Sequence, residues 1–93
     1  MTRPAPSLST PIEIAKWWRN RGGEAIVVRL TNWENRIFID VRNWVTVAGK
    51  LVPSKKGIAV GIRHLARLKA AIIKAEQQAH KLHLLPADDR ADQ

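Results

Sequence analysis

Cysteine is absent from this 93-residue chain, and acidic residues are scarce. Without cysteine there can be no disulfide, no thiolate metal site and no cysteine nucleophile. Only 8 Asp and Glu oppose 16 Lys and Arg, which leaves a net charge of +8. A balance this basic predicts a polyanionic partner, with nucleic acid the first candidate and an acidic membrane surface the second. The length suits one domain.

Long apolar runs are also missing. No stretch approaches the ~18–20 residues that a membrane-spanning helix needs, and the first residues lack the apolar core of a secretory signal. These absences predict a soluble intracellular domain. A helix lying on a membrane surface is disfavoured as well, because the one helical segment is rich in alanine and has no aromatic residue.

Composition divides the chain into three segments. Three of the five prolines fall within residues 1–11, which predicts a disordered N-terminal arm. The last eleven residues carry a net charge of −2 and contain Pro86, so residues 84–93 are predicted to form a disordered acidic tail. The folded domain is expected over residues 12–83.

The apolar residues recur in steps of two over residues 12–60 and in helical steps afterwards. This pattern predicts strands over residues 12–18, 24–31, 36–46 and 58–60, a basic loop over 54–57, and a helix from 62 or 63 to 83. Turns are expected at 20–23, 32–35 and 48–50, with Asn35 as a left-handed residue. The expected fold class is α+β, with a four-stranded antiparallel sheet followed by one C-terminal helix.

The two central strands separate their side chains by parity, since side chains alternate across a strand. One face is aliphatic: Ile26, Val28, Leu30, Ile37, Ile39 and Val41. The other face is aromatic and charged: Arg29, Thr31, Trp33, Arg36, Phe38, Asp40, Arg42 and Trp44. The first strand is ambiguous, because Trp17 and Trp18 point to opposite sides and either one could fill the core.

Flat rings interleaved with cations suit single-stranded nucleic acid, because each base stacked on a ring contributes ~1–3 kcal/mol and cations follow the phosphates. The predicted nucleic-acid-binding residues are Trp33, Trp44, Phe38, Arg29, Arg36, Arg42, Lys55, Lys56 and Lys16. The alternative is an aromatic cluster packed in a dimer interface or under a loop, with solvated arginines. Asp40 is predicted to orient a neighbouring arginine.

The helical segment has a narrow apolar seam at heptad spacing. Its residues are Leu65, Leu68, Ile72, Ala75, Ala79 and Leu82. We expect this seam to cover the aliphatic face of the sheet, and a seam this regular also suits a second copy of the chain.

No pattern indicates an enzyme. The carboxylates are scattered, and no Ser-His-Asp arrangement occurs in a suitable context. His80 and His83 lie one turn from Glu76 at a spacing that can hold a metal, but the chain supplies no further ligands. We therefore predict no catalytic residues, no metal and no cofactor.

Three stretches resemble the transcriptional coactivator family called positive cofactor four. They are residues 11–24, the Ile-Asp-Val-Arg stretch at 39–42 and the Lys-Lys-Gly-Ile-Ala-Val stretch at 55–60. The resemblance runs over about residues 11–83, and the first stretch is similar to short bacterial-type members. It implies a curved antiparallel sheet with a C-terminal helix, a homodimer, and paired channels for single-stranded DNA.

The resemblance also implies roles for individual residues. The aromatic residue at the reversal between strands two and three, which stacks bases, falls on Trp33. The DNA-contacting lysine of the family falls on Lys56, with Lys55 beside it. The arginine of the family's Ile-Asp-hydrophobe-Arg stretch falls on Arg42. The aromatic position at the end of the third strand is taken here by Trp44.

Several alternatives stay open at this stage. RNA or melted duplex would offer the same bases and phosphates, and a dimer of this kind could instead dock on a protein of the transcription machinery. The absence of a long serine-rich tail suggests a bacterial or phage setting. We expect a cytoplasmic, nucleoid-associated protein if the source is bacterial and a nuclear one if it is eukaryotic.

Overall fold

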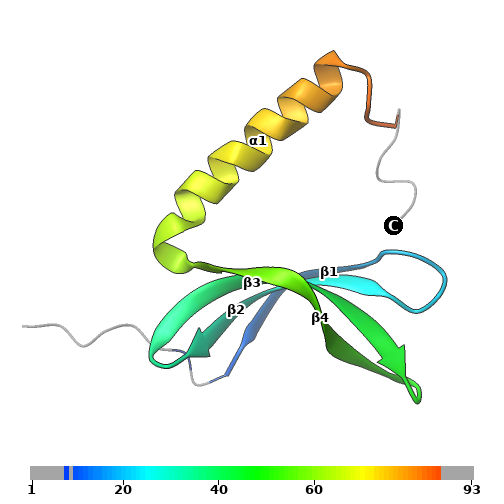
Figure 1. Ribbon diagram of the computed structural model, residues 1–93, viewed down its shortest axis with the longest axis vertical. Coiled ribbons are helices and arrows are strands. Elements are labelled where there is room, and N and C mark those ends of the chain that lie inside the picture. The colour runs from blue at the N-terminus through cyan, green and yellow to red at the C-terminus, as the bar shows by residue number, and fades with distance from the viewer. Residues whose placement is uncertain (1–7, 9, 87–93) are drawn as a thin grey trace, which may run out of the picture. The chain divides into compact units, whose positions relative to one another are not determined.

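A computed structural model describes residues 8 and 10–86. Four strands form one antiparallel sheet in the order of the chain: β1 (Ile12–Trp18), β2 (Ala25–Trp33), β3 (Arg36–Val47) and β4 (Lys50–Gly61) (Figure 1). A 3-10 turn, η1 (Ile62–His64), leads to one helix, α1 (Leu65–Lys81). The predicted α+β fold class is thereby confirmed. The predicted arm 1–11 and acidic tail 84–93 lie largely outside the described residues, and the domain limits remain predictions.

Two tight hairpins join β2 to β3 and β3 to β4. Trp33 pairs with Arg36, and the two residues between them, Glu34 and Asn35, have φ of 51° and 63°. The second hairpin repeats this geometry with Ala48 and Gly49 at φ of 52° and 80°. Positive φ at both central residues is what a type I′ turn requires, and such turns match the twist of the strands they join. The left-handed conformation predicted for Asn35 is confirmed.

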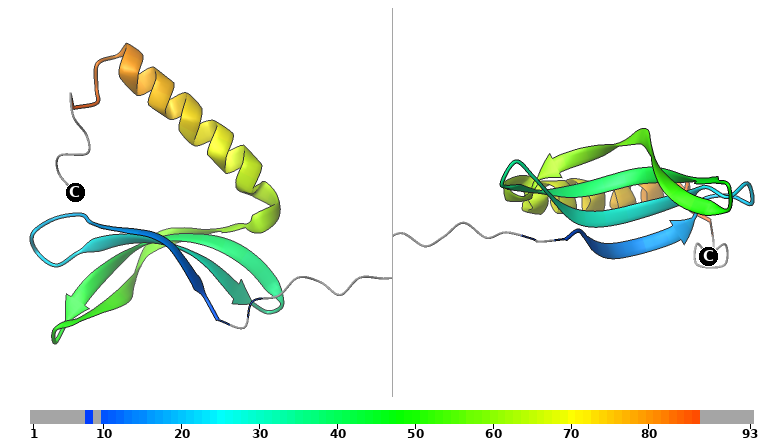
Figure 2. Two further views of the ribbon diagram at one scale, coloured as in Figure 1. Left: turned by 180° about the vertical axis from the view of Figure 1, so that it is seen from behind. Right: turned by 90° about the horizontal axis from the view of Figure 1, so that it is seen from below.

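The fourth strand is longer than predicted. The expected basic loop over residues 54–57 lies inside β4, so placing Lys55 and Lys56 in a loop was wrong. The register explains the error. Arg42 pairs with Gly57 whereas Trp44 pairs with Pro53, so three residues of β4 lie opposite one residue of β3. This irregularity bends the strand without ending it, and the bend is visible in both views of Figure 2.

A close approach of two backbones fixes the bend. A Cβ atom on Gly57 would lie 2.6 Å from the Val41 carbonyl oxygen and 2.7 Å from Cα of Arg42. Both neighbours belong to the backbone of β3, so neither can move aside cheaply. Glycine is therefore the residue that lets β4 return to β3 at this point.

The sheet register confirms the two predicted faces of the central strands. Directly opposed residues share a face, and the aliphatic pairs Val28–Val41 and Leu30–Ile39 lie on one side. A bulge between Glu13 and Ala15 settles the ambiguity of the first strand. Beyond it, Trp17 lies opposite Ile26 on the aliphatic face. Trp18 lies opposite Ala25 on the aromatic and charged face.

The buried residues lie on both sides of the sheet. Ile39, on the aliphatic face, is 7% exposed, whereas Ala25 and Val27, on the aromatic and charged face, are 0% and 2% exposed. The second face therefore has a small core of its own beneath its long side chains. Neither Trp17 nor Trp18 belongs to it, because both indoles are exposed.

Among the described residues, those up to Ile62 form one compact unit and those from Arg63 onward form a second, which contains α1. The helix ends at Lys81. The backbone N–H of Leu82 donates to the Gln78 carbonyl oxygen, and His83 follows at φ 56°. No residue of α1 is buried. That the apolar seam of α1 covers the aliphatic face of the sheet, or packs against a second copy of the chain, stays a prediction.

Candidate nucleic-acid interface

An open groove of about 580 Å³ lies on the aromatic and charged face of the sheet. Its lining comes from β2, β3 and the bend of β4, together with the residue just before β1. Its lining residues are Pro11, Arg29, Thr31, Asn32, Trp33, Asp40, Arg42, Pro53, Ser54 and Lys55. The groove therefore combines an indole, two guanidinium groups and an ammonium group with one carboxylate.

Asp40 and Ser54 hold the guanidinium group of Arg42. Its Nε donates to both Asp40 oxygens at 3.2 and 3.3 Å, and Nη2 donates to Oδ1 at 2.9 Å. Nη1 donates to the Ser54 carbonyl oxygen at 3.1 Å. This confirms that Asp40, which is 5% exposed, orients an arginine. Because the charge of Arg42 is paired with a carboxylate, its main effect is to fix the shape of the groove.

Arg29 and Trp44 form a second pair on the same face. The Arg29 guanidinium carbon lies 4.9 Å from the centroid of the Trp44 ring, within the range of a cation–π contact. By register, Val27 lies between the two positions, which explains why it is almost fully buried. One face of the Trp44 ring is thus covered by Arg29, and both side chains are half-buried.

The most accessible ring of the groove is Trp33. It ends β2 at the first hairpin, and 66% of it is exposed. Asn32, next to it, donates from Nδ2 to the Leu8 carbonyl oxygen at 3.0 Å. The backbone just before Pro11 is thereby tied to the Trp33 end of the groove. An indole held at a rigid turn beside cations can stack on a flat ring without losing much conformational entropy.

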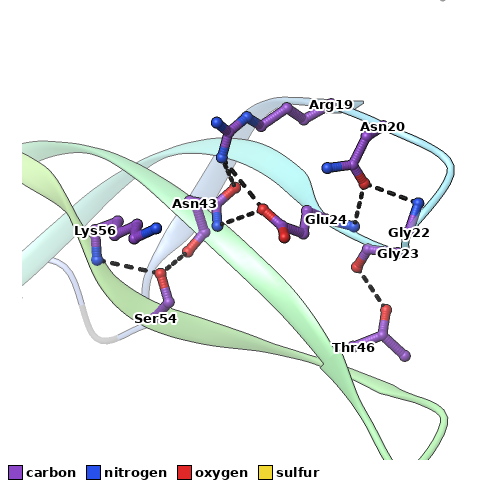
Figure 3. Close-up of polar contacts among 9 residues, drawn as sticks. All are labelled: Arg19, Asn20, Gly22, Gly23, Glu24, Asn43, Thr46, Ser54 and Lys56. Atoms are coloured by element: carbon purple, nitrogen blue, oxygen red, sulfur yellow. Dashed lines mark hydrogen bonds and ion pairs between the residues drawn. The ribbon is translucent and has the colours of Figure 1, made fainter.

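A polar network links the bend of β4 to the turn between β1 and β2 (Figure 3). Asn43, which is 7% exposed, donates from Nδ2 to Glu24 Oε1 at 3.1 Å, and Arg19 donates to both side chains. The Asn43 carbonyl accepts the Ser54 hydroxyl at 2.6 Å, and the same hydroxyl accepts the backbone N–H of Lys56 at 3.1 Å. The backbone of Lys56 is therefore held by the bend of β4.

Comparison with known proteins places this fold in a family. Residues 18–71 match the family described as Transcriptional Coactivator p15 (PC4). The chain belongs to the PC4 family. The match spans β2, β3, β4 and the first part of α1, up to residue 71, and includes all of the groove lining except Pro11.

Solved structures show the PC4 fold as well. A PC4 homolog from Burkholderia pseudomallei K96243, in an orthorhombic crystal form, superposes with a TM-score of 0.62 at 22% identity, covering 76% of this chain and 96% of that one. Its tetragonal form gives the same TM-score at 24% identity, with coverage of 72% and 98%. No curated protein sequence matches the chain significantly.

The groove brings together four of the nine residues predicted for this PC4-family face, and the other five are outside its lining. Arg29, Trp33, Arg42 and Lys55 are in its lining. Trp44 contacts Arg29, Arg36 is paired with Trp33, and Phe38 is paired with Thr31. Lys56 and Lys16 are exposed but are not among the described residues that line the groove.

Sequence reasoning missed the neutral part of the lining. Thr31 was placed on the correct face, but Pro53 and Ser54 were assigned to a loop and Asn32 to a turn. The signal that could have found them is the number of residues between Trp44 and Gly57, which is larger than a tight turn and a loop require. The twelve-residue β3 pairs with a strand of the same length, and that strand has to pass through Pro53, which a strand tolerates at an irregular position.

Two negative findings complete the description of the site. In the part of the chain that the structure describes, no helix is both long and apolar enough to cross a membrane. Among the same residues, no three His, Cys, Asp or Glu side chains come together as a metal-binding group.

Proposed function

We propose that this PC4-family protein binds single-stranded or locally unpaired DNA through the groove, with little sequence preference. One observation carries the proposal: an indole that is 66% exposed stands in the same groove as Arg29 and Lys55. Bases can stack on any accessible ring whatever their identity, and cations attract the phosphates of any sequence.

The geometry suggests a separate role for each side chain. Trp33 stacks on a base, because its ring is the accessible one. Arg29 and Lys55 contact phosphates, since neither forms a salt bridge among the described residues. Arg42 shapes the groove, because its charge is already paired with Asp40. Trp44 supports Arg29 in place of stacking on a base itself.

We further propose that the protein acts as a homodimer. The helix α1 has no buried residue, and even the aliphatic residues Leu65 and Ile72 of its apolar seam are 39% and 58% exposed. Aliphatic side chains at this spacing are typical of helices that pack against another element. Two subunits would present two grooves to one nucleic acid, which raises the affinity through multivalency.

The test is a titration with fluorescent oligo-dT at two salt concentrations, with matched duplex and RNA alongside. We expect tight binding, quenching of tryptophan fluorescence and an affinity that falls with salt at a slope of about −0.7 per phosphate neutralised. Trp33→Ala should weaken binding roughly 5- to 150-fold without unfolding the sheet. Combining Lys55→Ala with Lys56→Ala should make the salt slope shallower.

The same titration separates the alternatives. Binding only at millimolar oligo-dT would contradict the proposal and favour a protein-docking module. Stacking and phosphate contacts do not sense the sugar hydroxyl, so the choice between DNA and RNA rests on the measurement, and tighter binding to RNA would make RNA the target.

A further inference from the structure

We propose that Trp18 forms a second base-stacking site on strand β1, with Lys16 as its cation. The nucleic-acid-binding face would then continue beyond the groove, across β2 and onto the edge of the sheet. This inference rests on the proposed function, because it extends the path of the same bound strand. Its ligand is a nucleobase together with its phosphate.

The sheet register places Trp18 on the binding face. Trp18 pairs with Ala25, and Ala25 pairs in turn with Trp44. These three residues form one row across the sheet, so their side chains share a face. Ala25 is 0% exposed between the two indoles, whereas Trp18 is 57% exposed. The row thus ends in an accessible ring at the edge of the sheet.

The neighbouring row supplies the charge. Lys16 pairs with Val27, which pairs with Arg42, so Lys16 also lies on the binding face. It is exposed, two positions from Trp18, and forms no salt bridge among the described residues. Glu13 is on this face too, opposite Arg29 and farther from Trp18 along the strand. The end of β1 near Trp18 is therefore locally basic.

Burial against a second subunit explains this tryptophan less well than nucleic acid does. The exposed aliphatic residues of the sheet, such as Ile12 and Ile58, lie opposite Leu30 and Val41, on the other face. Trp17 is on that aliphatic face, opposite Ile26, and is the indole that an apolar interface would take. Trp18 instead shares its face with Lys16 and Arg42.

The separation of the two rings sets the length of strand required. Trp33 and Ala25 are the two ends of β2. At ~3.4 Å per residue, the eight steps between them span about 27 Å. A stacked single strand rises ~3.4 Å per nucleotide, so about eight nucleotides cover this distance, and fewer suffice when the strand is extended. Short oligomers cannot occupy both rings at once.

The adjacent tryptophans offer a matched pair of variants. Trp18→Ala and Trp17→Ala remove the same side chain from opposite faces of one strand. Each variant is titrated with oligo-dT of about four and about twelve nucleotides, lengths within the range of known single-strand sites. Solution mass and melting temperature are measured for both, so that affinities are compared at the same oligomeric state.

We expect Trp18→Ala to weaken the longer oligomer roughly 5- to 150-fold and the shorter one by less than about twofold. Trp18→Phe should restore most of the affinity, because a ring is still present. Trp17→Ala should leave the length dependence of binding as it is in the wild type.

Three results would overturn the inference. They are an unchanged affinity of Trp18→Ala for the longer oligomer, an equal loss for both lengths, and a loss that Trp18→Phe does not restore. Failure of the proposed function looks different. In that case the wild type itself does not bind oligo-dT, or Trp33→Ala has no effect. A wild type that binds through Trp33 and ignores Trp18 contradicts only the second site.

Discussion

The pairing of Arg29 with Trp44 leads to a prediction about how the protein responds to salt. If Trp44 positions Arg29 against a phosphate, removing the ring should weaken that charged contact and make the salt dependence of binding shallower. If Trp44 stacks on a base directly, removing the ring should act through stacking, which depends little on salt. The two roles therefore predict different salt slopes for the same variant.

The structure sets the size of the effect. The guanidinium carbon lies 4.9 Å from the ring centroid and both side chains are half-buried, so the contact is worth about 1 kcal/mol, between the exposed and desolvated cases. One lost phosphate contact makes the log–log salt slope shallower by about 0.7 on a single strand. Arg29→Gln should show this full change in slope.

Trp44→Leu should show part of the same change, whereas Trp44→Phe keeps an aromatic face and should retain the wild-type slope. Because the two side chains act as a unit, the double variant Arg29→Gln/Trp44→Leu should lose less than the sum of the single losses. The measurement is oligo-dT affinity across a series of salt concentrations, with urea unfolding of each variant as the control for stability.

Two outcomes would refute this reasoning. In the first, Trp44→Leu weakens binding equally at every salt concentration, with no change in slope. In the second, the losses from the two single variants add. Either result would mean that Trp44 meets the nucleic acid by its own ring and that Arg29 binds independently of it.

Three further predictions concern the scaffold. Gly57→Ala should lower stability by about 1–3 kcal/mol in urea unfolding, because the new Cβ meets the β3 backbone; an unchanged midpoint would contradict that close approach. Ala48→Gly should raise stability by about 1 kcal/mol, since Ala48 has φ of 52° and glycine adopts this conformation without strain; a loss in the same assay would argue against the turn type. Ile72→Asp should reduce the solution mass to that of a monomer or lower the melting temperature; no change in either would exclude the seam as a packing surface.

Much of the sheet could be predicted because its patterns are geometric. Alternation fixes which side chains of β2 and β3 share a face, whatever the surroundings, and the register confirms it. The first hairpin could be predicted because Asn35 tolerates the left-handed region. The second hairpin places Ala48 in that region too, and nothing in an alanine signals it.

The errors have a common physical origin. Pro53, Ser54 and Gly57 are residues that favour turns, and local propensity indicated a loop there. In the structure, pairing with β3 overrides this propensity, and the Ser54 hydroxyl and carbonyl hold the bend through Asn43 and Arg42. The bulge in β1 was hidden for a similar reason. An extra residue in a strand has no sequence signature of its own, because it is defined by its partner strand.

The position of Asp40 shows how a basic face can keep its shape. A carboxylate weakens attraction for phosphate, so its presence in the groove calls for a structural reason. Burial against Arg42 supplies one, because the pair fixes a guanidinium that also holds the bend of β4 through Ser54. The charge of Arg42 therefore serves to fix the shape of the groove. The cations available to phosphates are those that form no salt bridge with a carboxylate. The salt slope of the wild type should accordingly count Arg29 and the lysines and omit Arg42.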